Sequence, residues 1–169
     1  SIKFRSFMQG HPVVIIDNGK IVNNKIDFCN FVFVFSIIFV NIFYLLFLKK
    51  LIKTKSHRDT VDVLSACILG RLVSRLPALR PKIAVWIRDP NIWIRRSAIL
   101  FQLQFREYTD WDMLRSFCAH CAKDEETYIK SSISKALSEY ARINPQEVRK
   151  FVLSTPFSSQ TTQEILKNL

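Results

Sequence analysis

The sequence predicts an all-α protein, a short HEAT-like helical-repeat superhelix (an α-solenoid) that follows a separate hydrophobic N-terminal segment. Three observations lead to this prediction: apolar residues recur at helical spacing over residues 59–153, capping residues and prolines mark the helix ends, and a sequence block repeats. Helix pairs that recur roughly every 30 to 50 residues are typical of such solenoids. A coiled coil is the competing interpretation, but the frequent caps and prolines argue against it. We expect no β-sheet within residues 59–153.

The first helix of this region is predicted by the apolar spacing from Val61 to Leu76, and Pro77 ends it. A short helix is expected over residues 80–88. The turn at residues 89–91 then begins a strongly apolar helix, from Ile92 to about Phe105.

Capping patterns place the later helices. Thr109 with Asp112 predicts a capping box for a helix over residues 110–122, and Asp124 predicts the cap of a long helix that ends near residue 142. Asn144 as N-cap, followed by Pro145 and Glu147, begins another helix. A final capping box is expected at residues 161–164.

The internal repeat joins two of these helices. Four residues of one block match four residues of the next at a constant offset of 35: Asp89, Trp93, Ile94 and Arg95 match Asp124, Tyr128, Ile129 and Lys130. The match weakens after Lys130, which indicates a HEAT-like rather than a strict repeat.

The charge balance favours an anionic partner. The formal net charge is +11, and both parts of the chain contribute: residues 1–50 hold six Lys and Arg against two Asp, and the remainder holds nineteen against twelve acids. Such an excess is typical of proteins that bind nucleic acid or an acidic membrane face.

Residues 28–48 form an uncharged, apolar stretch of 21 residues that is followed at once by lysines. This length is close to the roughly 20 residues that cross a bilayer, and the lysines would place the C-terminal part on the cytoplasmic side. A mis-predicted exon and a buried core helix are the other interpretations. The sequence thus divides into an atypical segment, residues 1–52, and a helical-repeat domain, residues 53–169.

Cysteine and glycine usage argues against several kinds of site. Cys118 and Cys121 lie on one helix face without a second Cys/His pair for tetrahedral zinc, so we interpret them as buried thiols and expect no metal site. With only three glycines, phosphate-binding loops and nucleotide cofactors are not expected. No secretory signal is visible, so we expect an intracellular protein, in the cytoplasm or nucleus.

Charged residues within apolar helices are the candidate functional residues. Asp62 lies between two valines, and Arg95 and Arg96 interrupt a helix that is otherwise nearly all apolar. A charge in such a setting is either paired or solvated at the edge of the apolar face. Structural pairing is the favoured interpretation for Arg95.

Several blocks in this region resemble the DNA alkylation repair family, the helical-repeat glycosylases of the AlkD type. The resemblance covers residues 53–155, the C-terminal half of such a protein, and rests on the blocks at residues 59–62, 69–73, 91–103 and 136–145, followed by Val148 and Phe151.

The resemblance implies a curved protein that binds duplex DNA carrying alkylated purines and hydrolyses the N-glycosidic bond of purines alkylated at N3 or N7. It implies that Asp62 is the catalytic carboxylate and that Arg96 contacts DNA beside the lesion. It implies no cofactor, and we expect a monomer. The further candidates for one DNA-binding groove are Arg58, Arg71, Arg75, Arg95 and Lys135.

The sequence departs from the family at two of these positions. The family presents aromatic residues where Arg58 and Lys135 stand, and those rings flank the deoxyribose. Two cations there would retain phosphate affinity but repel a positive transition state. The alternative function is therefore a catalytically inactive solenoid that acts as a DNA- or protein-binding scaffold.

Overall fold

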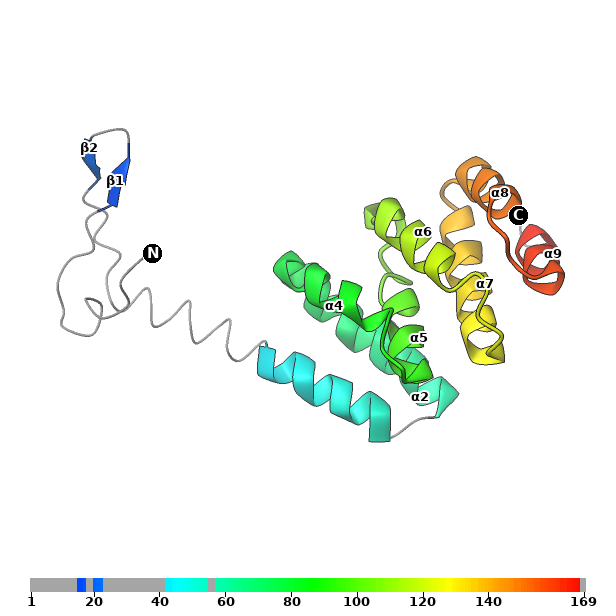
Figure 1. Cartoon of the computed structure of the whole chain (residues 1–169), viewed down its shortest axis with the longest axis horizontal. Coiled ribbons are helices and arrows are strands. Elements are labelled where there is room, and N and C mark those ends of the chain that lie inside the picture. Colours follow the sequence, from blue (N-terminus) through cyan, green and yellow to red (C-terminus); the bar gives the residue numbers. More distant parts are fainter. Residues whose placement is uncertain (1–14, 18–19, 23–41, 55–56, 168–169) are drawn as a thin grey trace. The chain divides into compact units, whose positions relative to one another are not determined.

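The structure, a computed structural model, describes residues 15–17, 20–22, 42–54 and 57–167. The chain divides into two compact units, Ser1–Tyr44 and Leu45–Leu169. In the first unit, strands β1 (Ile15–Asp17) and β2 (Lys20–Val22) form an antiparallel pair with Ile15 opposite Val22. In the second unit, residues 57–167 hold helices and no strand, which confirms the predicted all-α fold of that region (Figure 1).

A helix over residues 42–54 contributes the first core residues of the second unit. Leu45, Leu48 and Ile52 are buried at helical spacing. The compact unit therefore begins inside the segment that we expected to be separate, before residue 53. Residues 28–41 of the expected membrane span lie outside the described residues. Within the described part of the chain, every helix is too short or too polar to span a bilayer.

The next helix runs without interruption over residues 58–75, but it changes geometry in the middle. An α-helical start, α2 (Arg58–Val63), passes into a π-helical turn, η2 (Leu64–Leu69), and then into α3 (Gly70–Arg75). The apolar spacing predicted this helix and its end before Pro77. It did not predict the π-helical turn, because one extra residue per turn leaves little trace in a hydrophobic pattern.

The remaining helices follow with short connections. Their bounds are η3 (Pro77–Leu79), α4 (Arg80–Trp86), α5 (Ile92–Leu100), η4 (Arg106–Tyr108), α6 (Trp111–His120), α7 (Thr127–Ala141), α8 (Pro145–Ser154) and α9 (Ser159–Lys167).

These helices form two rows within the second unit. The 58–75 helix, α5, α7 and α9 pack against one another in that order, while α4 and α6 pack on α5 and α8 packs on α7 (Figure 1). Their buried apolar residues form one continuous cluster from Leu45 to Ile165, in which Phe101 is fully buried. This arrangement of stacked helix pairs is the predicted HEAT-like solenoid, and we call the row of the 58–75 helix, α5, α7 and α9 the inner row.

Two predicted helix starts, the turn at residues 89–91 and the Asn144 cap, are confirmed. The side-chain oxygen of Asn91 accepts hydrogen bonds from the backbone N–H groups of Trp93 and Ile94, at 3.0 and 3.3 Å. The Asn144 side chain accepts one from the Glu147 N–H at 3.2 Å. Both helices therefore begin where the sequence places them.

Three other predicted caps are wrong by one to three residues. Asp110, rather than Thr109, caps α6 by accepting from the Met113 N–H at 3.0 Å. Ser158, rather than Thr161, caps α9. Asp124 lies two residues before the true N-cap of α7, Glu126, and its carboxylate forms an ion pair with Arg95 between repeats.

Candidate functional site

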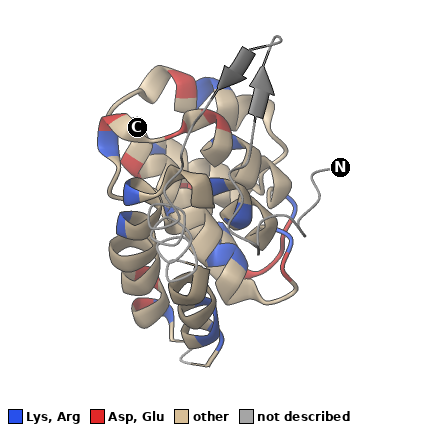
Figure 2. Ribbon diagram, turned by 90° about the vertical axis from the view of Figure 1, so that its left-hand side faces the viewer, with Lys and Arg blue, Asp and Glu red and all other residues tan. Residues whose placement is uncertain are grey.

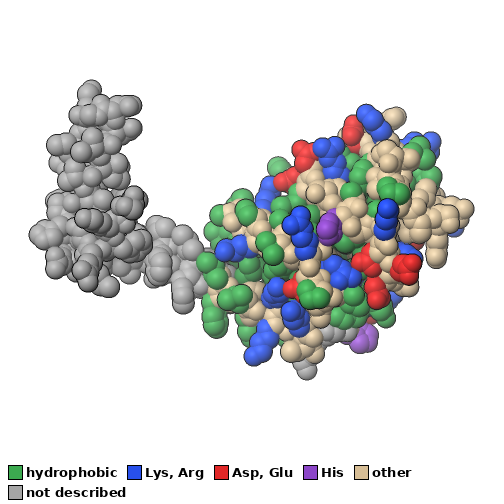
Figure 3. All heavy atoms as spheres, in the orientation of Figure 1, with side chains coloured by type: hydrophobic (Ala, Val, Ile, Leu, Met, Phe, Trp, Pro, Cys, Tyr) green, Lys and Arg blue, Asp and Glu red, His purple; other side chains and the backbone are tan. Residues whose placement is uncertain are grey.

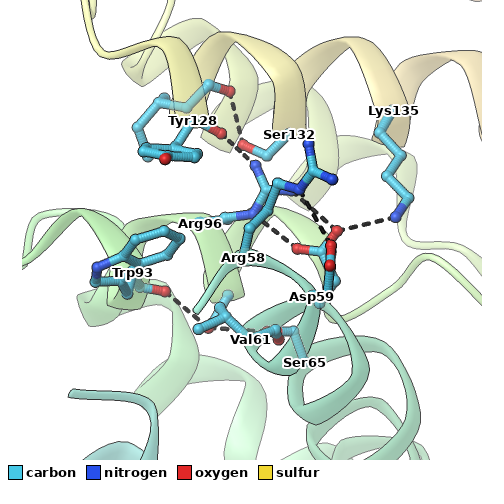
Figure 4. A network of polar contacts seen from close by, with 12 residues as sticks. Arg58, Asp59, Val61, Ser65, Trp93, Arg96, Tyr128, Ser132 and Lys135 are labelled. Carbon is cyan, nitrogen blue, oxygen red and sulfur yellow. Dashed lines mark hydrogen bonds and ion pairs between the residues drawn. The ribbon is translucent and has the colours of Figure 1, made fainter. Parts of the chain in front are cut away.

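The candidate site is built around the carboxylate of Asp62, on α2. Its Oδ1 accepts a hydrogen bond from Arg96 Nε at 2.7 Å, and its Oδ2 accepts one from Arg96 Nη2 at 2.9 Å. Oδ2 also accepts from Lys135 Nζ at 3.0 Å. Arg96 reaches the carboxylate from α5 and Lys135 from α7, so three consecutive helices of the inner row meet at one residue (Figure 4). The structure thus brings together three of the predicted site residues.

Arg96 is almost completely buried, with 1% of its side chain exposed. Its third guanidinium nitrogen, Nη1, donates to the backbone carbonyl of Tyr128 at the beginning of α7. All three nitrogens therefore have acceptors within the protein. In this arrangement the guanidinium faces Asp62 and Tyr128 rather than solvent, and a contact between Arg96 and DNA stays a prediction.

The electrostatics of the pair keep Asp62 ionised. Burial raises the pKa of the Asp62 carboxyl, but the hydrogen bonds and charges of Arg96 and Lys135 outweigh burial, and the net pKa is lowered. The carboxylate keeps 14% of its side-chain surface exposed. It is thus an anion at neutral pH that keeps a small exposed surface.

Arg58 and Lys135 are the two positions at which the resemblance led us to expect aromatic rings. Lys135 is about half exposed and pairs with Asp62, whereas Arg58 pairs with its neighbour Asp59 at 3.1 Å in an exposed position. Figure 4 shows Arg58 and Lys135 on either side of the polar network that includes Arg96. The positive charges around Asp62 are therefore partly neutralised, but no ring flanks the carboxylate from these two positions.

An open pocket of about 250 Å³ lies one helical turn before Asp62. Trp93 and Tyr128 form one wall, with ring centroids 4.8 Å apart, and residues 57–59 form the other. Trp93 and Tyr128 occupy equivalent positions of the 35-residue repeat. Because consecutive repeats stack on each other, this offset could have predicted that the two rings are in contact. Neither residue was among the predicted site residues.

Two serines reinforce the contact between the same helices. Ser65 Oγ lies within hydrogen-bond distance of the Val61 carbonyl and, at 2.8 Å, of Ser97 Oγ, and its single hydroxyl proton serves one of them at a time. Ser97 donates to the Trp93 carbonyl. Both serines are fully buried. They link the π-helical turn to α5 beside the Asp62–Arg96 ion pair. No pattern in the sequence predicted this contact.

Arg95 has the structural role that the sequence favoured. Its Nη2 forms an ion pair with Asp124 Oδ2 at 3.0 Å, and its Nη1 donates to the carbonyls of Asp89 and Pro90. Arg95 therefore ties consecutive repeats together. Its guanidinium is mostly buried, which makes it a poor candidate for a DNA contact.

Basic residues recur along the helices of the unit (Figure 2), and on the face drawn in Figure 3 they alternate with apolar patches. Arg71 and Arg75 lie at the C-terminal end of the 58–75 helix, two or more turns beyond Asp62. The structure thus places them on the same inner-row helix as Asp62 but outside the Asp62–Arg96–Lys135 cluster.

The thiols of Cys118 and Cys121, which the sequence analysis considered as zinc ligands, are buried and form no disulfide. Burial raises the pKa of both, and that of Cys121 reaches about 11. Such thiols are protonated and unreactive at neutral pH. No group of three or more metal-ligating side chains gathers among the residues that the structure describes.

Comparisons with known proteins match this geometry. A family model described as "DNA alkylation repair enzyme" matches residues 39–168. A solved structure described as a predicted DNA alkylation repair enzyme from Enterococcus faecalis is similar, with a TM-score of 0.66 and 28% sequence identity. That similarity covers 72% of this chain but 57% of the relative, so the chain spans little more than half of the relative's length. A comparison with curated proteins found no match.

Proposed function

Because the chain belongs to the DNA alkylation repair enzyme family, we propose that it binds duplex DNA and acts as a glycosylase on purines alkylated at N3 or N7. One observation carries this proposal: Asp62 is an ionised carboxylate, partly exposed, and held rigidly by Arg96 at the meeting point of three inner-row helices.

Such a carboxylate suits this reaction. Alkylation makes the purine cationic, so the base leaves without needing an acid. The bond between the base nitrogen and C1′ breaks, a water oxygen bonds to C1′, and the water loses a proton. Positive charge develops on the deoxyribose along this path, and a fixed anion stabilises it more than mobile water would. Asp62 would supply that anion and orient the water.

A second candidate function is favoured by Lys135. Its ammonium lies 3.0 Å from Asp62 Oδ2, and together with Arg96 it surrounds the carboxylate with two positive charges. These charges oppose a cation at the same position. A protein that binds DNA without cleaving the glycosidic bond is therefore the alternative.

Lys135→Gln separates the two functions. The substitution keeps a similar length but removes one charge from an exposed pair, so it has little effect on folding. If Asp62 stabilises the deoxyribose cation, excision of 7-methylguanine from a duplex should rise in Lys135→Gln. In Asp62→Asn it should fall by about 10²-fold or more at a temperature where the variant is folded.

Arg115 is an exposed basic residue of α6 that pairs with Asp112. Arg115→Gln is the matched control and should leave the rate unchanged. If neither the wild type nor Lys135→Gln excises 7-methylguanine while both bind the duplex, the glycosylase assignment is wrong and the scaffold remains.

A further inference from the structure

The helix over residues 42–54 (cyan in Figure 1) has an apolar face that is exposed to solvent. One side of this helix, described above, is buried in the core. The opposite side, which we call the exposed face, holds four residues at the i, i+3, i+4 and i+7 spacing of one helix face: Phe43, Leu46, Phe47 and Lys50. The three apolar side chains are between 57% and 63% exposed.

Other helices of the second unit expose mainly polar residues. The exposed residues of α6 include Asp112, Arg115 and Ser116, and those of α9 include Gln163 and Glu164. A surface helix normally buries one apolar stripe and turns polar residues to water, whereas a helix that is apolar on both sides has partners on both sides. Contiguous exposed apolar side chains mark surfaces that bind protein or membrane. The exposed face of helix 42–54 therefore has the character of a binding surface.

The charges on this helix indicate the kind of partner. No Asp or Glu occurs within residues 28–58. Lys50 lies on the exposed face and has no acidic partner among the residues that the structure describes. Lys53, beside this face, keeps 44% of its side chain exposed, although it lies 3.8 Å from Asp89. A partner that presents negative charges next to apolar groups therefore fits this surface.

The surface of an anionic lipid bilayer has both properties. Aromatic and leucine side chains enter the headgroup region of such a bilayer, and lysines beside them attract the acidic lipids. A second copy of the chain fits less well, because a symmetric contact would bring the lysines of the two faces together, and the net charge of +11 opposes association. The other side of the helix is buried in protein, so the contact is confined to the bilayer surface.

We propose that the exposed face of helix 42–54 docks the protein on the surface of a membrane that contains anionic lipids. Phe43, Leu46 and Phe47 enter the headgroup region, and Lys50 and Lys53 bind the acidic headgroups. This surface lies on a different helix from Asp62, and the proposal depends neither on DNA binding nor on glycosylase activity.

Co-sedimentation of the full chain with lipid vesicles tests this surface. The vesicles are phosphatidylcholine alone or an equal mixture of phosphatidylcholine and phosphatidylglycerol. The wild type should bind the mixed vesicles, and Lys50→Gln should bind them about fivefold more weakly, the effect of one lysine at an anionic surface. Leu46→Gln/Phe47→Gln should bind at least about tenfold more weakly, because two apolar side chains no longer enter the bilayer. Both positions are exposed, so the melting temperature should stay that of the wild type.

Two matched controls replace exposed residues elsewhere in the second unit. Val85→Gln/Leu153→Gln removes two apolar side chains that are 68% and 67% exposed. Lys150→Gln removes an exposed lysine of α8. Both control variants should bind the mixed vesicles as the wild type does.

Four results would overturn the proposal. If the wild type stays in the supernatant with the mixed vesicles, the face does not bind anionic lipid. If Leu46→Gln/Phe47→Gln binds as tightly as the wild type, the membrane contact lies elsewhere in the chain. Equal binding to both kinds of vesicle, unchanged in Lys50→Gln, would show that acidic headgroups are not recognised. A wild-type dimer in analytical ultracentrifugation that the double variant converts to a monomer, without binding to vesicles, would assign the face to a second copy of the chain.

Discussion

Replacing Asp62 with Asn should destabilise the fold, because the substitution removes the partner of a buried charge. The Arg96 guanidinium is 1% exposed and donates twice to Asp62 and once to the Tyr128 carbonyl. Removing one partner of a buried pair costs about 3–5 kcal/mol, since the other charge stays buried and uncompensated. An Asn side chain keeps one acceptor oxygen, and position 62 is partly exposed. We therefore expect a loss near the lower limit, about 3 kcal/mol.

Urea denaturation followed by far-UV circular dichroism measures this loss. Asp112→Asn is the matched control, because its pair with Arg115 is exposed and should contribute less than about 0.5 kcal/mol. Adding Arg96→Met to Asp62→Asn should cost less than the sum of the two single changes, since the orphaned charge is then gone. A loss below about 1 kcal/mol in Asp62→Asn, with an unchanged m-value, would refute the buried-pair reasoning.

The same pair predicts a pH dependence. The folded-state pKa of Asp62 lies below its usual value of 3.8. Its contribution to stability is therefore complete above about pH 5 and is lost as the pH falls through 3.8 toward the lowered pKa. The stability difference between wild type and Asp62→Asn should shrink over that acid range. A difference that stays constant down to pH 3 would contradict the ionised pair.

Three further outcomes are expected. Gly70→Ala should destabilise the protein by about 1–3 kcal/mol in urea, because the clash with the Phe101 carbonyl outweighs the higher helix propensity of Ala; a more stable variant would disprove that close contact. Asn144→Ala should cost about 1 kcal/mol in the same assay through loss of the α8 cap, and no change would mean that the cap is not formed in solution. Iodoacetamide at pH 8 should label Cys67 before Cys118 and Cys121 in peptide mass spectra, since burial raises the pKa of the latter two; equal rates would contradict their burial.

The helices could be predicted largely because apolar spacing and caps are local signals. Val61 to Leu76, the Asn91 turn and the Asn144–Pro145 cap all mark elements that the structure contains. The errors at Thr109 and Thr161 have one cause, which does not apply to Asp124, because α7 begins after Glu126 without a side-chain cap. Ser, Thr and Asp near a helix start are interchangeable in a sequence pattern, and only the three-dimensional partners decide which one caps.

The site could be predicted only in part. The resemblance identified Asp62 and Arg96, and their roles toward substrate and DNA stay predictions. It did not predict that the two residues pair with each other. The pairing of Lys135 with Asp62, 73 residues apart, is a long-range contact that no local pattern reveals. The hydrogen bond from Arg96 to the Tyr128 carbonyl could not be predicted either, because every residue type has a backbone carbonyl.

The Asp62–Arg96 pair also affects how relatives of this protein can be interpreted. A change at position 62 would leave the buried Arg96 charge without its carboxylate, so the requirement to fold favours keeping Asp62. A descendant that had stopped repairing DNA would still be under that pressure. The presence of this aspartate therefore does not distinguish active from inactive relatives. The side chains at positions 58 and 135 are the more informative markers, because they can change without unfolding the chain.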